Sequence, residues 1–308
     1  MILSLELCFQ QERNLNMAFG QHQSFYLRDR WIERIFKNVS NDDRFFYRKD
    51  AFEKVGLGKN MVKSLRFWAL ATNLVDERIR EDRKKGHFIT DFSKFVRDND
   101  PYIQMRDTLS LLHYYIVSRT EPATTWYWFF NIYNETFTTK NRISEDLIEW
   151  VDIEKDIKVS ENSLKRDVDC LIKLYTAGQN SQDPEEVNQS PLHVLNLLEV
   201  SQNSVRKVFK EGKDIGYTTL MYVLLDYAQT NQTKDLLVDE ILNQPGLWGR
   251  VFNMSRSSVV DSLNRLTDHP KHSISFIRTN NLDTVRLPDI TPLEFLQFEY
   301  ERKAEVAL

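Results

Sequence analysis

The chain of 308 residues is 41% hydrophobic and 28% charged, a composition that excludes a largely disordered protein and allows two or three compact units. Only 9 glycines and 8 prolines leave little material for a β-sandwich or barrel, so helices are expected. Cys8 and Cys170 suit a reducing compartment, and the sequence has neither a basic leader nor a long uncharged apolar window, so we expect a cytoplasmic protein outside the membrane.

The net charge of −4 is distributed unevenly along the chain. Residues 1–100 carry 19 lysines and arginines against 15 aspartates and glutamates, whereas the remaining residues carry 22 against 30. This asymmetry favours an N-terminal part that faces an anionic partner and a more acidic remainder.

Helical periodicity first becomes clear in the segment 25–39, where apolar side chains recur every three or four residues. The segment 50–56 predicts a short helix that Gly56 closes in a left-handed conformation. After the next turn, Asn60 is predicted to cap a second helix that runs to about Leu74. This pattern is typical of a helix-turn-helix.

A hairpin is expected directly after the second helix. Segments 74–80 and 87–90 can pair as two strands across a turn at residues 82–86. The turn holds three consecutive basic residues, 83–85, so the hairpin would be a wing with a basic tip. The segment 50–90 therefore predicts a winged helix-turn-helix.

The segment 102–137 is rich in aromatic residues and predicts a pair of helices. Its aromatic run, Trp126–Phe130, is interpreted as buried core rather than as a platform on which bases stack. The polar segment 177–189 is predicted to be a linker.

Two later segments repeat the helix-turn-helix pattern more weakly. Ser160 and Ser255 are each predicted to cap a helix, 161–175 and 256–266 respectively. The flanking elements that we expect are a helix at 148–157 before the first and two strands at 273–278 and 283–287 after the second.

These elements predict a mainly α protein with small β wings, in which winged helix-turn-helix units surround a central helical core. The expected domains are an N-terminal winged helix-turn-helix DNA-binding domain at 1–100, an aromatic-rich helical core with a second helix-turn-helix-like unit at 101–178, and a C-terminal winged-helix-like domain at 179–308.

The second helix of the first unit carries candidate contacts to double-stranded DNA. Lys59, Lys63 and Arg66 recur at helical spacing, with Asn60 beside them, and such groups contact phosphates and base edges in the major groove. The candidates at the hairpin tip are Arg83, Lys84 and Lys85. A solvated face and a protein-interaction module are the alternatives, and dimerisation through the helix near Arg256, giving a homodimer, also remains open.

The residues alone give little support for hydrolytic chemistry. Asp167 and Asp169 lie two apart on a helix and point to different faces, so solvated or ion-paired carboxylates are the simpler interpretation. His113 lies on an apolar face and predicts a hydrogen-bonded core histidine. His22 lies in a polar loop, where we expect it to be exposed and able to act on a phosphodiester. The sequence contains no phosphate-binding glycine loop, zinc spacing or nucleophile elbow.

The order of several motifs resembles a bacterial family of proteins of unknown function, often encoded beside enzymes similar to phosphoadenosine-phosphosulfate reductase. An extra Gln21 separates Gly20 from His22, where the family's opening motif has them adjacent. The motifs that carry the resemblance are Phe19–Trp31, Gly56–Val62 with Arg66–Trp68, Asp100–Tyr102, Thr108–His113, Trp128–Asn131 and Leu164–Cys170.

Members of this family with a defined role resemble SspB-like nicking subunits of the single-stranded Ssp DNA phosphorothioation system, which is used in phage defence. The resemblance implies a DNA nickase that depends on a divalent metal, magnesium or manganese. It would open one strand so that a cysteine desulfurase, an ATPase and an ATP-pyrophosphatase-like protein can install sulfur. The candidate nicking residues within the matching motifs are His22, Arg28, Asp167 and Asp169.

The absence of a recognisable carboxylate cluster keeps two other functions open. One is a non-catalytic winged-helix DNA-binding adaptor or transcriptional regulator. The other is a scaffold that binds only proteins.

Overall fold

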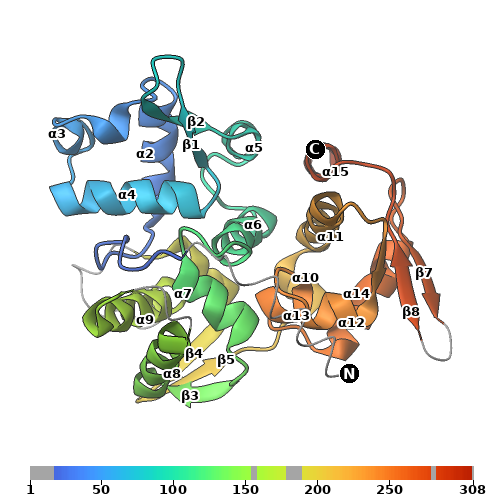
Figure 1. Ribbon diagram of the computed structural model, residues 1–308. Helices are drawn as coiled ribbons and strands as arrows, with labels where there is room; N and C mark the ends of the chain where they lie inside the picture. The colour runs from blue at the N-terminus through green and yellow to red at the C-terminus, as the bar shows by residue number, and fades with distance from the viewer. Residues whose placement is uncertain (1–16, 154–157, 178–188, 279–281, 307–308) are drawn as a thin grey trace.

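The computed structural model describes residues 17–153, 158–177, 189–278 and 282–306. Within these ranges the protein is mainly helical, with three small antiparallel sheets (Figure 1). The prediction of a mainly α fold with small β elements is therefore confirmed. None of the described helices combines the length and the apolar character that crossing a membrane requires.

In the first part of the chain, a short helix is followed by a longer helix and then by a hairpin. The elements of this part are α2 (Asp29–Val39), the 3-10 helix η1 (Phe45–Tyr47), α3 (Ala51–Val55), α4 (Lys59–Ala71), β1 (Val75–Ile79), β2 (Lys85–Ile89) and α5 (Asp91–Asn99). As predicted, Gly56 ends α3 in the left-handed region, with φ of 62°. This conformation costs glycine little because it lacks a Cβ.

Three predicted boundaries in this part are wrong. Helix α2 begins at Asp29 rather than near Phe25, because residue 28 is extended and the Phe25 carbonyl accepts hydrogen bonds from α4 side chains. Helix α4 is flanked by an extended Gly58, so Asn60 lies inside the first turn instead of capping it. The turn of the hairpin spans residues 80–84 rather than 82–86, since Lys85 already pairs with Ile79.

The second part of the chain combines several helices with a three-stranded sheet. Its elements are α6 (Arg106–Val117), α7 (Thr124–Tyr127), the π-helix η2 (Trp128–Ile132), β3 (Phe137–Thr139), α8 (Lys140–Ile153), α9 (Glu161–Thr176), the 3-10 helix η4 (Pro191–Leu195), β4 (Leu198–Ser201) and β5 (Ser204–Lys207). Ser160 caps α9 as predicted. Helix α8 starts eight residues before the expected helix, and residues 154–157 lie outside the described ranges, as does most of the predicted linker 177–189.

The third part repeats the arrangement of the second. Its elements are α10 (Gly212–Ile215), α11 (Tyr217–Asn231), β6 (Asp235–Leu237), α12 (Val238–Asn243), α13 (Trp248–Val251), α14 (Arg256–Thr267), β7 (Ser275–Arg278), β8 (Asp283–Arg286) and α15 (Pro292–Val306). Ser255 caps α14 as predicted, and β7 pairs with β8 where a hairpin was expected.

The two three-stranded sheets share one topology. In each, the first strand precedes a helical segment, the hairpin follows it, and the last strand lies in the middle: β3-β5-β4 and β6-β8-β7. The central strands carry buried valines in equivalent places, Val205 opposite Thr138 and Val200, and Val285 opposite Leu236 and Phe276.

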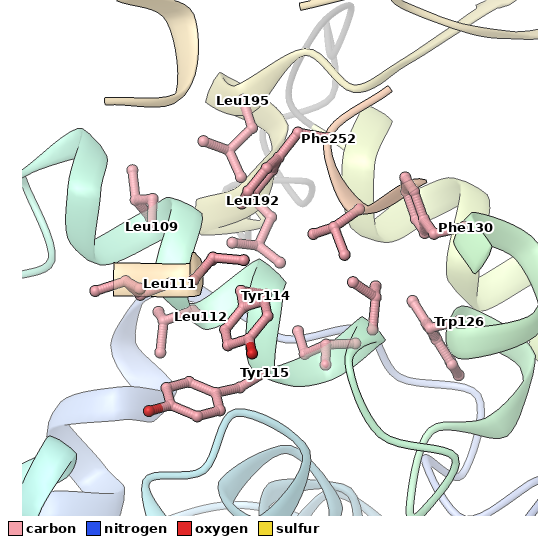
Figure 2. Packing of buried hydrophobic residues seen from close by; sticks show 14 of the residues in the cluster. Leu109, Leu111, Leu112, Tyr114, Tyr115, Trp126, Phe130, Leu192, Leu195 and Phe252 are labelled. Atoms are coloured by element: carbon pink, nitrogen blue, oxygen red, sulfur yellow. The ribbon is translucent and has the colours of Figure 1, made fainter. Parts of the chain in front are cut away.

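Helix α6 lies at the centre of the molecule, and every residue from Asp107 to Val117 is buried. Figure 2 shows its leucines and tyrosines packed with the aromatic run that follows and with side chains of the two later parts, among them Leu192, Leu195 and Phe252. Trp126 and Phe130 are each 1% exposed, so the interpretation of the aromatic run as core is confirmed.

The last described helix, α15, packs against helices from much earlier in the chain, α5 and α6. It runs beside α11 (Figure 1). Its Lys303 Nζ lies 2.5 Å from Asp107 Oδ2 on α6, and the Tyr300 hydroxyl lies 2.8 Å from that of Thr108. The Tyr300 ring also packs against Phe95 of α5. These contacts join elements that are nearly 200 residues apart in the chain.

Candidate nucleic-acid interface

The N-terminal half of α4 is the exposed half. Lys59, Asn60 and Lys63 are all exposed, whereas the second half of the helix is buried on most sides, as at Leu65 and Trp68. The amino end of a helix presents free backbone N–H groups and a partial positive charge, which favour a phosphate. Only this end of α4 can approach a large anionic partner.

Arg66 is not a free cation. Its guanidinium forms an ion pair with Glu77 of β1, and its Nε lies 2.9 Å from His87 Nε2. Lys85 Nζ lies 2.6 Å from the other carboxylate oxygen of Glu77, and the Tyr47 hydroxyl donates to the same group at 2.7 Å. Of the predicted DNA contacts, Arg66 therefore joins α4 to the hairpin, whereas Lys85 joins the two strands of the hairpin to each other.

Partial burial would raise the pKa of Glu77, but the hydrogen bonds from Lys85, Tyr47 and Arg66 outweigh it and lower that pKa to about 2. The carboxylate is thus charged at any ordinary pH. Burial and the neighbouring Arg66 charge lower the pKa of His87 to about 4. A neutral His87 leaves Nε2 free to accept from Arg66, as the 2.9 Å distance indicates.

The remaining predicted cations are available to a partner. Arg83 and Lys84 lie exposed at the hairpin tip, at the upper edge of the view in Figure 1, and within the described ranges neither forms an ion pair. Lys59 Nζ lies over the Phe52 ring at 5.0 Å, and Lys63 is exposed on the next turn. In contrast, Arg256 of α14 pairs with Asp239.

His22 is buried, and the prediction of an exposed histidine is wrong. It is 1% exposed, and its ring packs edge-on against Phe67 and Trp126. The physical reason is Asp167 on α9, whose Oδ1 lies 2.7 Å from His22 Nε2. This partner is 145 residues away in sequence and draws the loop 20–24 into the space between α4, α7 and α9.

The Asp167 carboxylate is also fully used within the protein. It accepts from the Gly20 backbone N–H at 2.9 Å and from the Thr125 hydroxyl at 2.9 Å in addition to His22. Gly20 has φ of 69°, a conformation that favours glycine, and a Cβ there would lie 2.8 Å from Ser163 Oγ, which would have to shift. The His22–Asp167 pair therefore fixes the loop in this structure.

The other two predicted catalytic residues lie apart from this pair. Asp169 is half-buried and forms an ion pair with Lys140 at 2.5 Å, so it points to a different face from Asp167, as the spacing predicted. The guanidinium of Arg28 lies 5.6 to 6.0 Å from the centres of three aromatic rings, those of Phe25, Tyr26 and Trp31.

The described residues do not fit a metal centre built by the protein alone. Within those ranges, no group of three or more His, Cys, Asp or Glu side chains is placed to hold a metal ion. His22 and Asp167 supply two donors, but each already serves the other. No chemical step is assigned to a metal at this pair.

The sequence interpretation missed two groups of residues. The first group is Glu77, which neutralises the charge of Arg66, and Tyr47, which donates to Glu77. The pairing of Glu77 with His87 across the predicted hairpin was the signal in the sequence that could have indicated this group. Gln21 and Gln23 line a hollow beside α4 together with Lys63. No local signal marks them, because their position depends on the distant Asp167.

Comparisons with known proteins agree with the family expected from the motifs. The model of a protein family of unknown function, DUF4007, matches residues 19–300, and the chain therefore belongs to this family. No curated protein matches the chain.

Two solved structures share the fold. A magnesium ion-bound SspB crystal structure is 22% identical with a TM-score of 0.83, and the match covers 94% of this chain and 88% of that one. A second SspB crystal structure is 20% identical with a TM-score of 0.83, covering 96% and 90% respectively. The chain is thus similar to SspB in fold along nearly its whole length.

Proposed function

We propose that this protein is an SspB-like, DNA-binding and strand-nicking component of a DNA phosphorothioate modification system in the cytoplasm. The observation that carries the proposal is the likeness in fold to SspB over 94% of the chain. The proposed partners are double-stranded DNA, a cysteine desulfurase, an ATPase and an ATP-pyrophosphatase-like protein. A homodimer remains a prediction.

We further propose that the three hairpins belong to winged helix-turn-helix units. The order strand, helices, hairpin with the last strand central recurs in the second and third parts and is the order that a winged helix requires. In the first part the hairpin β1-β2 follows α3 and α4 directly. The helix that would enter the major groove is α4, since its exposed amino end carries Lys59, Asn60 and Lys63.

In this proposal the seven predicted DNA contacts divide into two sets. Lys59, Asn60 and Lys63 on α4, with Arg83 and Lys84 at the hairpin tip, would contact DNA. Arg66 holds the hairpin against α4 through Glu77, and Lys85 pairs with the same carboxylate from within the hairpin. The positions of the tip and of the helix end then depend on each other, which fixes the spacing of the phosphates that they contact.

Nicking is hydrolysis of one phosphodiester, and its dependence on magnesium or manganese is part of the proposal. Because a general acid or base must come within hydrogen-bond reach of its substrate, the buried His22 and Asp167 are proposed to position the loop rather than to touch DNA. Arg28 and Asp169 stay predictions. A cation commonly binds through one or two carboxylates together with substrate phosphates, so the test uses protein and DNA together.

Supercoiled plasmid provides the direct test. We expect conversion to the open circle when the purified protein is supplied with magnesium or manganese, and no conversion when a chelator is added. A Lys59→Ala/Lys63→Ala double variant should nick more slowly, and its binding should depend less steeply on salt, by about 2 in the slope of log K against log salt. Lys213→Ala/Lys234→Ala removes the same charge from exposed positions elsewhere and should change neither.

A second candidate function is a non-catalytic DNA-binding adaptor or regulator. The observation that favours it is the lack of a metal-binding group of acids and histidines within the described ranges. Protein that retains the plasmid in a gel shift but never opens it, alone or with the partner proteins, would replace the nicking proposal with this one.

A further inference from the structure

A hollow of about 530 Å³ lies between the loop 20–24 and α4. The more exposed part of its lining is polar and comes from Gln21, Gln23 and Lys63. The more buried part is apolar and includes Phe46, Phe67 and Leu70. The volume falls within the range of roughly 300–1,000 Å³ that holds a small organic molecule.

The loop that carries the two glutamines has a fixed shape. Gly20, Gln23 and Ser24 have φ of 69°, 52° and 65°, backbone conformations that residues other than glycine rarely adopt. Two hydrogen bonds to the buried Asp167, one from the His22 ring and one from the Gly20 N–H, hold this backbone in place. The Phe25 carbonyl in turn accepts from Trp68 at 2.9 Å, which ties the end of the loop to α4. The backbone that carries the two amides is thus positioned before any ligand arrives.

This combination matches one chemical class of ligand. A planar base packs against aromatic and aliphatic side chains with its faces, and its edge carries neighbouring hydrogen-bond donors and acceptors. A primary amide offers both a donor and an acceptor, so two of them can match such an edge. Lys63 is a point charge suited to a phosphate attached to the same nucleotide.

We propose that this hollow takes one nucleobase turned out of the DNA duplex, with Gln21 and Gln23 at its hydrogen-bonding edge and Lys63 on a flanking phosphate. The inference rests on the proposed DNA binding and adds to it a pocket for a single base. It gives a function to the buried His22–Asp167 pair, which holds the pocket loop in place. The hollow lies along the middle of α4, from Val62 to Leu70, and shares Lys63 with the exposed end of that helix.

The experiment compares three short duplexes of the same flanking sequence in a fluorescence anisotropy titration. One is fully paired, one carries a single unpaired base, and one carries an abasic residue in place of that unpaired base. An unpaired base spares the protein the cost of opening a pair, so we expect about tenfold tighter binding, equivalent to about 1.4 kcal/mol, than to the paired duplex. The abasic duplex, which bends as easily but has no base to insert, should lack this advantage.

Two variants locate the effect in the hollow. Leu70→Trp fills the space, and Gln21→Ala removes one amide from an exposed position where folding is not at risk. Both should lose the preference for the unpaired base and keep the affinity for paired DNA. Lys84→Ala, at the hairpin tip, should weaken binding to all three duplexes equally. Circular dichroism verifies that each variant is folded.

The binding results distinguish a failure of the base pocket from a failure of the proposed DNA binding. Equal binding of the three duplexes by the unaltered protein overturns the base pocket and leaves DNA binding intact. A preference that survives in both Leu70→Trp and Gln21→Ala overturns the location of the pocket. Failure to bind any duplex at low salt overturns the DNA-binding proposal and the pocket with it.

Discussion

His113 shows how one buried side chain can be satisfied in only one protonation state. Its Nε2 lies 2.7 Å from the Val251 carbonyl oxygen, which can only accept, so Nε2 carries the proton. Its Nδ1 lies 2.8 Å from the Tyr175 hydroxyl and therefore accepts from it. The prediction of a hydrogen-bonded core histidine is confirmed, and this neutral ring joins α6 to α9 and α13.

The protonation of His113 should make the protein sensitive to mild acid. Burial lowers its pKa from 6.5 to about 4. Between these values the unfolded chain takes up a proton that the folded protein does not, so the free energy of unfolding falls as pH is lowered from about 6.5 to about 4, by about 3 kcal/mol for this residue. Above pH 6.5 its contribution is constant. Urea unfolding at a series of pH values measures the effect.

The variant His113→Gln should be less stable at pH 7.5 but should lose less stability on acidification. Its amide can still donate to the Val251 carbonyl, yet it does not titrate. His193→Gln removes a half-buried histidine and serves as the control. An unchanged pH dependence in His113→Gln would show that other groups govern the acid response.

The contrast between His113 and His22 shows when the burial of a single residue can be predicted from the sequence. His113 lies within a continuous apolar helix, so its own neighbours indicate burial. His22 lies among glycine, glutamine and serine, and its burial comes from an aspartate 145 residues later. Local sequence could identify both residues as candidates but could place only the first.

At the scale of the helix and strand, the predictions that rest on neighbouring residues are the ones that the structure confirms. Ser160 and Ser255 each cap the predicted helix by accepting from the backbone N–H three residues on. Asn60 has the same propensity, but Gly58 already has the extended conformation that precedes a helix, so the helix starts earlier. The ion pair between Arg66 and Glu77, which joins α4 to the hairpin, was not predictable, because it depends on how the two elements pack.

That junction gives a prediction about DNA binding. Glu77→Gln should release Arg66 and Lys85 from their shared carboxylate and make them available to phosphates. The slope of log K against log salt should become steeper by about 2. The adjacent Asp76→Asn makes the same change of charge on β1, and among the described residues Asp76 forms an ion pair with Arg78 alone, so this variant is the matched control. If both variants change binding equally, overall charge rather than the release of these two cations is responsible.

At the scale of the whole molecule, one hydrophobic core runs from Leu27 to Tyr300. The recurring sheet topology was only partly visible in the sequence: the final hairpin was predicted, but β3 and β6 are three residues long and carry little pattern. The predicted domain boundaries at 100 and 178 stay predictions. The sheet β3-β5-β4, however, pairs strands from both sides of residue 178.

A fragment ending at residue 178 tests the second boundary. It would keep β3 and α9 but lose β4, β5 and the buried Leu192, Leu195 and Leu198 that pack on the central helices. We expect it to unfold without a cooperative transition in urea, followed by tryptophan fluorescence, while the full chain shows one. A sharp transition in the fragment would establish 1–178 as an independently folding unit.

The return of α15 to α6 also has a consequence for biosynthesis. The 196 residues between Asp107 and Lys303 take roughly 10 to 40 s to translate. Throughout that interval Asp107 and Thr108 have been synthesised, but their hydrogen-bond partners Lys303 and Tyr300 have not. A ribosome that stops before residue 292 therefore releases a chain with an open edge on its central helix, a substrate for chaperones and proteases rather than a shortened working protein.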